Sequence, residues 1–332
     1  MTAARPADSR KFRAAREDQW RRLEEILNQA EKRSVRKLSD EDLLALPILY
    51  RGALSSLSVA RETSLDHELV TYLEGLCARA YFFVYGVRTS ARQRLAAFFR
   101  ADLPAAVRGL WRETLVALTL TLIGALTGYL LVSGDSSWYG AFVPEQLAGG
   151  RGFGASAETL RDTLYHDQGG QGLGFFATFL FTHNSGVAIW AFALGFAFGV
   201  PTALLLIQTG AMMGAFVALF ASRGLGEELG GWLIIHGSSE ILAIVLAGAA
   251  GFRIGWSVVF PGERTRLASA SLGGTKAALV MGGVVVMLLV AGLLEGFGRQ
   301  LILIDWIRYA IGLSMLLLWC VYFYLPRRAA NG

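Results

Sequence analysis

The sequence predicts an all-α membrane protein with about six transmembrane helices and a helical N-terminal domain in the cytoplasm. Three observations lead to this fold class. The 332-residue chain is 54% hydrophobic and only 17% charged, whereas soluble domains carry about 25% charged residues. Beyond residue 113 it holds six apolar runs of roughly 20 residues, the length that crosses a hydrocarbon core. Of its 31 lysines and arginines, 20 lie in the first 113 residues.

Residues 1–110 are expected to form the cytoplasmic domain. Trp20, Leu23 and Leu27 recur at helical spacing between residues 13 and 36. Ser39 followed by Asp42 is typical of a helix start, so a second helix is expected at 40–62 and a third at about 65–85. The first 20 residues are polar and basic, and no secretory signal is expected there.

The end of this domain is expected to lie on the membrane. Arginines alternate with leucines and phenylalanines over 92–108, a pattern typical of an amphipathic helix on an anionic inner leaflet. A basic patch can also bind nucleic acid, but its place beside a transmembrane span favours lipid. The residues predicted to contact lipid or a partner are Arg92, Arg94, Arg100 and Arg108, with Arg253, Arg264 and Arg266 of a later loop.

The transmembrane domain is expected at 111–326. Its spans are predicted at about 114–132, 174–200, 202–221, 231–252, 277–294 and 306–325, with a glycine-rich outer loop at 133–172. This topology puts 26 of the 31 basic residues on one side, which predicts that both termini lie in the cytoplasm. Polar residues interrupt the second span at 183–186, so 174–184 crosses the membrane, re-enters it or lies in the interface.

Five polar residues within the predicted spans or at the end of one form the candidate site: His183, Asn184, His236, Glu240 and Glu295. Ionisable groups at this depth cost several kcal/mol and persist when they are paired or functional. Three interpretations stay open. The residues knit the bundle together through hydrogen bonds, they line a transport path or ion site, or they serve a metal-dependent intramembrane hydrolase with His183, His236 and Glu240 as ligands.

The third interpretation departs from the best-known zinc motif. The string HGSSE at 236–240 lacks the second histidine of HExxH and the glutamate that acts as its general base. No P-loop motif GxxxxGK[ST] is present, and two cysteines provide no disulfide framework. The expectation is therefore a protein that is not an enzyme and has no cofactor, with a divalent metal as the exception. Expected partners are membrane lipids, envelope proteins and a second copy, and not nucleic acid.

Several strings resemble the stage II sporulation protein M family, also called DUF95. They are THNSGVA at 182–188, GVPT at 199–202, IHGSSEILA at 235–243 and AGLLEGF at 291–297. LYR at 49–51 and LSSLSVAR at 54–61 resemble the longer members of the family, those with an N-terminal cytoplasmic helical domain and no link to sporulation. The resemblance spans about 10–325, with one departure at Thr209, where the family usually has asparagine.

The resemblance implies a multi-pass protein of the bacterial inner membrane, and the namesake of the family acts at the membrane during engulfment together with cell-wall hydrolases. It brings no established catalytic residues, but its motifs include the five polar residues that the cost of burial had already selected. The leading hypothesis is a non-enzymatic scaffold or assembly component of the cell envelope, with a homodimer as a plausible state. The alternatives are a transporter or lipid-handling protein with a polar conduit, and the metal-dependent hydrolase.

Overall fold

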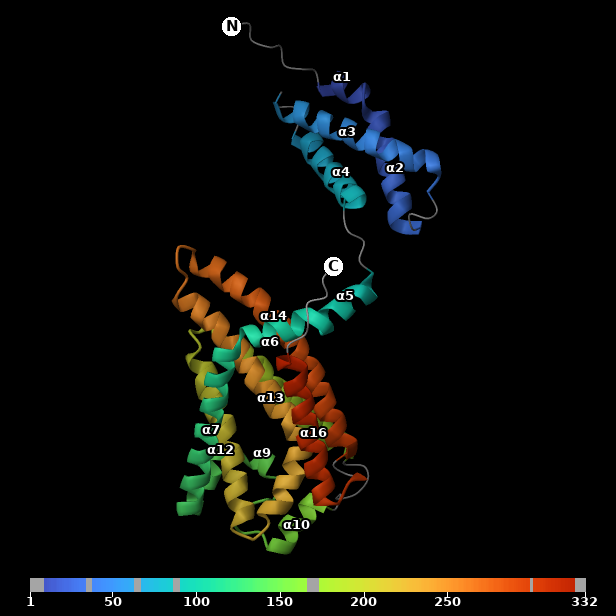
Figure 1. Cartoon of the computed structure of the whole chain (residues 1–332). Coiled ribbons are helices and arrows are strands. Elements are labelled where there is room, and N and C mark those ends of the chain that lie inside the picture. The colour runs from blue at the N-terminus through green and yellow to red at the C-terminus, as the bar shows by residue number, and fades with distance from the viewer. Residues whose placement is uncertain are drawn as a thin grey trace. The chain divides into compact units, whose positions relative to one another are not determined.

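The computed structural model describes residues 9–33, 38–62, 67–85, 90–165, 173–298 and 301–325. All regular secondary structure in these ranges is helical, which confirms the predicted fold class. The chain divides into two compact units, Met1–Ala91 and Arg92–Gly332 (Figure 1).

The first unit contains α1 (Ser9–Ala14), α2 (Glu17–Arg33), α3 (Asp40–Glu62) and α4 (His67–Tyr85). The predicted helix start is confirmed, because Ser39 Oγ accepts a hydrogen bond from the Asp42 amide at 3.1 Å and donates one to Asp42 Oδ2 at 2.8 Å. α2, α3 and α4 pack together around a core that includes Trp20, Leu23 and Leu73. This unit therefore has an apolar core of its own.

The segment predicted to lie on the inner leaflet packs against the second unit over its C-terminal half, and its placement on the leaflet stays a prediction. It forms α5 (Ala91–Ala97), the π-helical turn η2 (Phe98–Asp102) and α6 (Leu103–Gly109). Leu103 and Val107 are buried in the core of the second unit, and Tyr322 donates a hydrogen bond to the Phe99 carbonyl at 2.6 Å. The division between the units falls after Ala91, so the segment up to residue 110 belongs with the bundle rather than with the first unit.

Each predicted span corresponds to one helix. These helices are α7 (Trp111–Gly134), α11 (Leu173–Ala193), α12 (Val200–Ala221), α13 (Gly226–Val259), α14 (Arg266–Leu293) and α16 (Asp305–Tyr324). α11 continues without a break through the polar residues at 183–186 and ends before the predicted boundary at 200. A 3-10 turn and two residues with positive φ, Phe198 and Gly199, separate it from α12.

Among the residues that the structure describes, six helices are long and apolar enough to cross a membrane, and five of them coincide with predicted spans. The sixth is α3, which begins with three acidic residues and packs in the core of the first unit. α11 is not in this set, and its side chains are described only from Phe181 on.

α13 is the centre of the second unit. This 34-residue helix packs against α7, α11, α12, α14 and α16. Small residues allow the close approach, since a Cβ at Gly251 would overlap the backbone of α11 and one at Gly312 would overlap the backbone of α13. Small residues at helix contacts are the usual means of packing in membranes, where lipid competes with protein for apolar surface.

α7 and α12 pack closely against each other along a seam of four glycines. Gly124 and Gly128 of α7 face Gly210 and Gly214 of α12, and a Cβ at any of them would overlap a carbonyl oxygen of the other helix. Two of the GxxxG pairs in the sequence therefore meet each other within one chain.

The connection between α7 and α11 covers one end of the bundle, opposite the end where α6 lies (Figure 1). It contains η3 (Ser136–Trp138), α8 (Tyr139–Phe142), α9 (Glu145–Ala148) and α10 (Ala157–Tyr165), and residues 166–172 lie outside the described ranges. Tyr139, Leu160 and Leu164 form a second apolar cluster with Phe220 and Leu229 of the spans.

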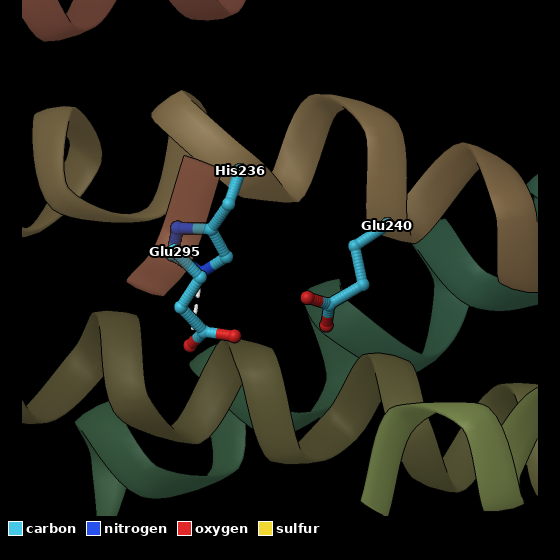
Figure 2. A group of neighbouring side chains, drawn as sticks. All are labelled: His236, Glu240 and Glu295. Atoms are coloured by element: carbon cyan, nitrogen blue, oxygen red, sulfur yellow. Dashed lines mark ion pairs between the residues drawn. The ribbon is translucent and has the colours of Figure 1, made fainter. Parts of the chain in front are cut away.

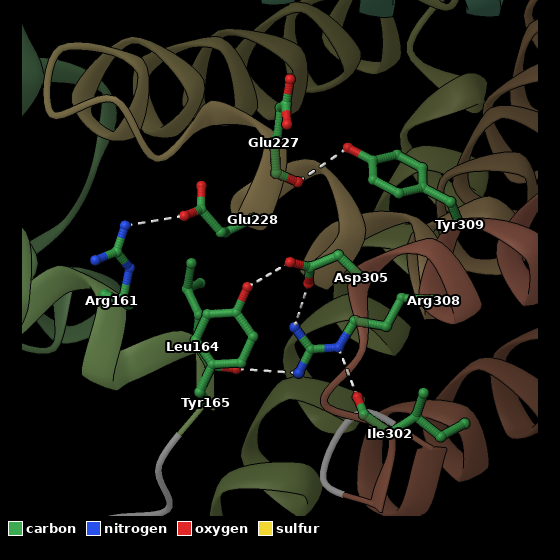
Figure 3. A network of polar contacts seen from close by, with 9 residues as sticks. All are labelled: Arg161, Leu164, Tyr165, Glu227, Glu228, Ile302, Asp305, Arg308 and Tyr309. Carbon is green, nitrogen blue, oxygen red and sulfur yellow. Dashed lines mark hydrogen bonds and ion pairs between the residues drawn. The ribbon is translucent and has the colours of Figure 1, made fainter.

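A polar network anchors α10 to the bundle (Figure 3). The Arg308 side chain of α16 is 0% exposed and donates hydrogen bonds to the carbonyls of Ile302 at 2.7 Å and Leu164 at 3.2 Å, and to Asp305 Oδ1 at 3.3 Å. Its guanidinium lies over the Tyr165 ring, 4.9 Å from the centroid. One buried cation thus joins α10, α16 and the turn before α16.

Candidate functional site

A cavity of about 130 Å³ lies inside the second unit. All five polar residues selected from the sequence line it: His183, Asn184, His236, Glu240 and Glu295. His183 and Asn184 come from α11, His236 and Glu240 from α13, and Glu295 from the π-helical turn η5 (Leu294–Gly298) after α14. π-helical turns are frequent at functional sites. Three elements that are separate in the sequence therefore bring their polar groups to one place.

Three of these side chains form a tight cluster (Figure 2). One potential ligand atom from each of His236, Glu240 and Glu295 lies within 4.8 Å of the others. His236 Nε2 is 3.8 Å from Glu295 Oε1, and the two residues are only 5% and 2% exposed. The set differs from the one that the sequence suggested for a metal, because Glu295 takes the place of His183. His183 lines the same cavity.

Neighbouring groups fix the orientation of the cluster. The Asn184 side chain lies beside the Glu240 carboxylate and interacts with it. The Trp232 ring, one turn before His236 on α13, meets the imidazole edge-on with 5.6 Å between centroids. On the next turn, Ser239 accepts a hydrogen bond from Trp319 Nε1 at 2.9 Å, which fixes α13 against α16.

The rest of the cavity wall is mostly apolar. Its apolar residues are Leu147, Met212, Met213, Phe216, Phe220, Leu229, Trp232, Leu233 and Ile241. Leu147 and Arg151 belong to the connection between α7 and α11, so the cavity extends toward the end of the bundle that this connection covers. Polar groups at one position within an apolar wall are the usual composition of a small-molecule site.

Arg151 is the cationic residue of the cavity wall. Its guanidinium donates hydrogen bonds to the carbonyls of Ala148 and Leu147, both at 2.9 Å, and lies 5.3 Å from the centre of the Phe216 ring. Burial lowers the pKa of Arg151, and burial raises the pKa of the neighbouring Tyr139 to about 12. Neither shift changes the charge at neutral pH, so Arg151 remains a cation and Tyr139 a neutral hydroxyl.

Arg108 and Arg253, both expected to contact lipid or a partner, are held by contacts within the chain. Arg108 donates to the Phe323 carbonyl at 2.7 Å. Arg253 donates to the Gly109 carbonyl at 2.8 Å and pairs with Glu113 at 3.0 Å. The exposed residues of this group are Arg92, Arg94, Arg100, Arg264 and Arg266. Contact with lipid or a partner therefore remains a prediction, and it concerns chiefly these five.

Sequence reasoning found the polar residues and missed two other features. Arg151 had counted only as a basic residue on the outer side, although it follows a Gly149-Gly150 pair that allows a tight turn. Arg308 had also counted only as a basic residue on the outer side. Its position one turn after Asp305 in an apolar span could have indicated that it is paired. An arginine at such a place is expected to be paired.

Comparisons with known families agree with this description. A family profile described as stage II sporulation protein M matches residues 117–298, more than half of the chain and all five polar residues of the cavity. A second profile, described as a domain of unknown function (DUF8413), matches residues 10–86. No curated protein and no solved structure matches the chain. With its apolar spans and this match, the chain is a multi-pass membrane protein that belongs to the stage II sporulation protein M family.

Proposed function

We propose that this protein is a component of the bacterial inner membrane that takes a small polar ligand, the head of a lipid, into its intramembrane cavity. One observation carries the proposal: five polar residues from three elements converge on a single cavity with an apolar wall. This corresponds to the lipid-handling alternative of the sequence analysis.

The volume supports binding over a role as structural glue alone. A sealed polar core would fill its space with hydrogen-bonded side chains, whereas about 130 Å³ is room for several water molecules. The same volume is below the roughly 300–1,000 Å³ of sites for drug-sized ligands. The cavity therefore suits a head group or another small polar group, with acyl chains outside it.

The position of Arg151 suggests the side from which the ligand enters. Arg151 and Leu147 lie on the connection expected to face outward, while His236 and Glu240 lie on α13 and Glu295 on the turn after α14. A head group that enters from the outer side meets the cation first and the cluster second.

Assembly is a second candidate function, and the first unit favours it. Residues 10–86 match a family of their own and form a compact helical unit with its own core, which is suited to contact an envelope partner. In this view the cavity supplies the ligand-dependent part of a scaffold. Both termini would lie in the cytoplasm, as the distribution of basic residues predicts.

Photo-crosslinking tests the lipid proposal. Benzoylphenylalanine is placed at Phe220, which is buried and lines the cavity, or at Phe323, which is equally buried but lies elsewhere in the core. After irradiation in cells, the mass of the intact protein should reveal a lipid adduct at Phe220 and not at Phe323. No adduct at either position, or equal yields at both, would contradict a lipid-binding cavity.

A further inference from the structure

The cluster of His236, Glu240 and Glu295 points to a further property. We propose that these three residues bind a divalent transition metal ion, with zinc the best match to the donor set. This proposal does not rest on lipid binding, and the two tests are independent.

The donor atoms lie slightly farther apart than the ligands of a bound metal ion. Two ligands of a tetrahedral zinc ion with bonds of about 2.0–2.2 Å are about 3.4 Å apart. His236 Nε2 and Glu295 Oε1 are 3.8 Å apart, and no pair in the cluster exceeds 4.8 Å. Small side-chain rotations therefore bring all three atoms within bonding distance of one metal ion, without movement of the helices.

The charges favour a divalent cation over a purely hydrogen-bonded core. Two carboxylates so close together in the interior of a membrane protein repel each other when both are ionised. A dication between them neutralises both charges and uses the imidazole as a third ligand. Imidazole suits zinc and other transition metals better than magnesium or calcium, which prefer oxygen ligands alone.

The surroundings resemble those of a catalytic rather than a structural zinc site. Structural sites use four protein ligands, whereas catalytic sites use three and leave one position open. All three cluster residues line the cavity, so the open position faces it. Asn184, which lies beside Glu240, supplies an outer contact that orients this ligand. The arrangement would let a bound metal meet whatever enters the cavity.

Elemental analysis tests this proposal on the full-length protein, purified in detergent without chelators and without a histidine tag. The wild type should contain about one zinc per chain, or take it up when zinc is added after chelation. Glu295→Gln and Glu240→Gln should lose the metal. Asn184→Ala should weaken zinc binding about 10–100-fold, as expected for the loss of an orienting contact.

Two controls separate this ligand set from others. Glu228→Gln changes a carboxylate on the same helix that pairs with Arg161, outside the cluster, and should keep the zinc. His183→Ala should also keep it. Loss of zinc in His183→Ala with retention in Glu295→Gln would overturn the assignment in favour of the set first suggested by the sequence.

The melting temperature provides a second test, which does not depend on how well the glutamine variants fold. Zinc should raise the melting temperature of the chelated wild type, because a ligand that binds only the folded state stabilises it, and His183→Ala should show the same rise. A wild type that neither contains zinc nor takes it up would refute the metal site and leave the lipid-binding cavity unaffected. Zinc retained by both glutamine variants would refute it as well.

Discussion

Replacement of Arg308 by methionine should release α10 from the bundle. The substitution keeps roughly the same volume but removes the donors to the carbonyls of Ile302 and Leu164. Hydrogen bonds from a charged group contribute about 1.5–3 kcal/mol each, so the two carbonyl bonds represent about 3–6 kcal/mol. Methionine offsets part of this loss because it spares the burial of a charge. The net destabilisation should be about 2–4 kcal/mol.

Thermal unfolding of the full-length protein in detergent, followed by tryptophan fluorescence, measures this effect. For a unit of this size 1 kcal/mol shifts the melting temperature by about 2–4 °C, so a fall of about 5–15 °C is expected. Arg308→Lys keeps the charge without the planar fork of donors and should fall in between. Limited proteolysis should also cut the connection between α7 and α11 faster in Arg308→Met than in the wild type.

Arg161→Met is the matched control. Arg161 belongs to the same network, but its ion pair with Glu228 is solvent-exposed on the arginine side and should contribute about 0–1 kcal/mol. If Arg308→Met were no more destabilising than Arg161→Met, the conclusion that a buried guanidinium anchors α10 would be refuted.

Two further predictions concern the glycine seam and the first unit. Gly214→Ala should destabilise the bundle by about 1–3 kcal/mol, because its Cβ would overlap the Ala125 carbonyl. Gly274→Ala, at an open helix position, should not destabilise it. Equal melting temperatures of the two variants would contradict this prediction. Burial and a hydrogen bond to Glu24 raise the pKa of Tyr72 from 10.0 to about 12, so its contribution to stability should be lost as pH rises through this range. The difference between absorbance titrations of the wild type and Tyr72→Phe should show ionisation near pH 12, and a value near 10 would argue against the contact.

The sequence alone was sufficient to locate the membrane-spanning helices and to identify the polar residues that line the cavity. Hydropathy located the spans, and Ser39 with Asp42 located the start of α3, because these signals are local. The cost of burying ionisable groups selected the five cavity residues without any knowledge of their neighbours. Local patterns could not show which groups meet. Glu295 joins His236 because a π-helical turn ends α14 beside α13, and this depends on tertiary packing.

The contacts of the 92–108 segment could not be predicted from the sequence for a related reason. An apolar helix face has the same sequence pattern whether it packs on lipid or on protein, so the pattern did not show that Phe99 and Leu103 contact the bundle. The role of a positively charged residue was ambiguous in the same way. Arg308 was used only to predict the membrane topology, and its burial in a polar network was therefore missed.

The glycine seam between α7 and α12 also has a consequence for biosynthesis. The two helices are separated by residues 135–199, which a ribosome adds in about 3–13 s at 5–20 residues per second. During that interval the glycine face of α7 has no α12 to pack against, while the connection and α11 are synthesised. Pairing of α7 with α12 must therefore follow the synthesis of α11, and a nascent chain stalled before residue 200 would present the unpaired groove of α7 to the insertion machinery.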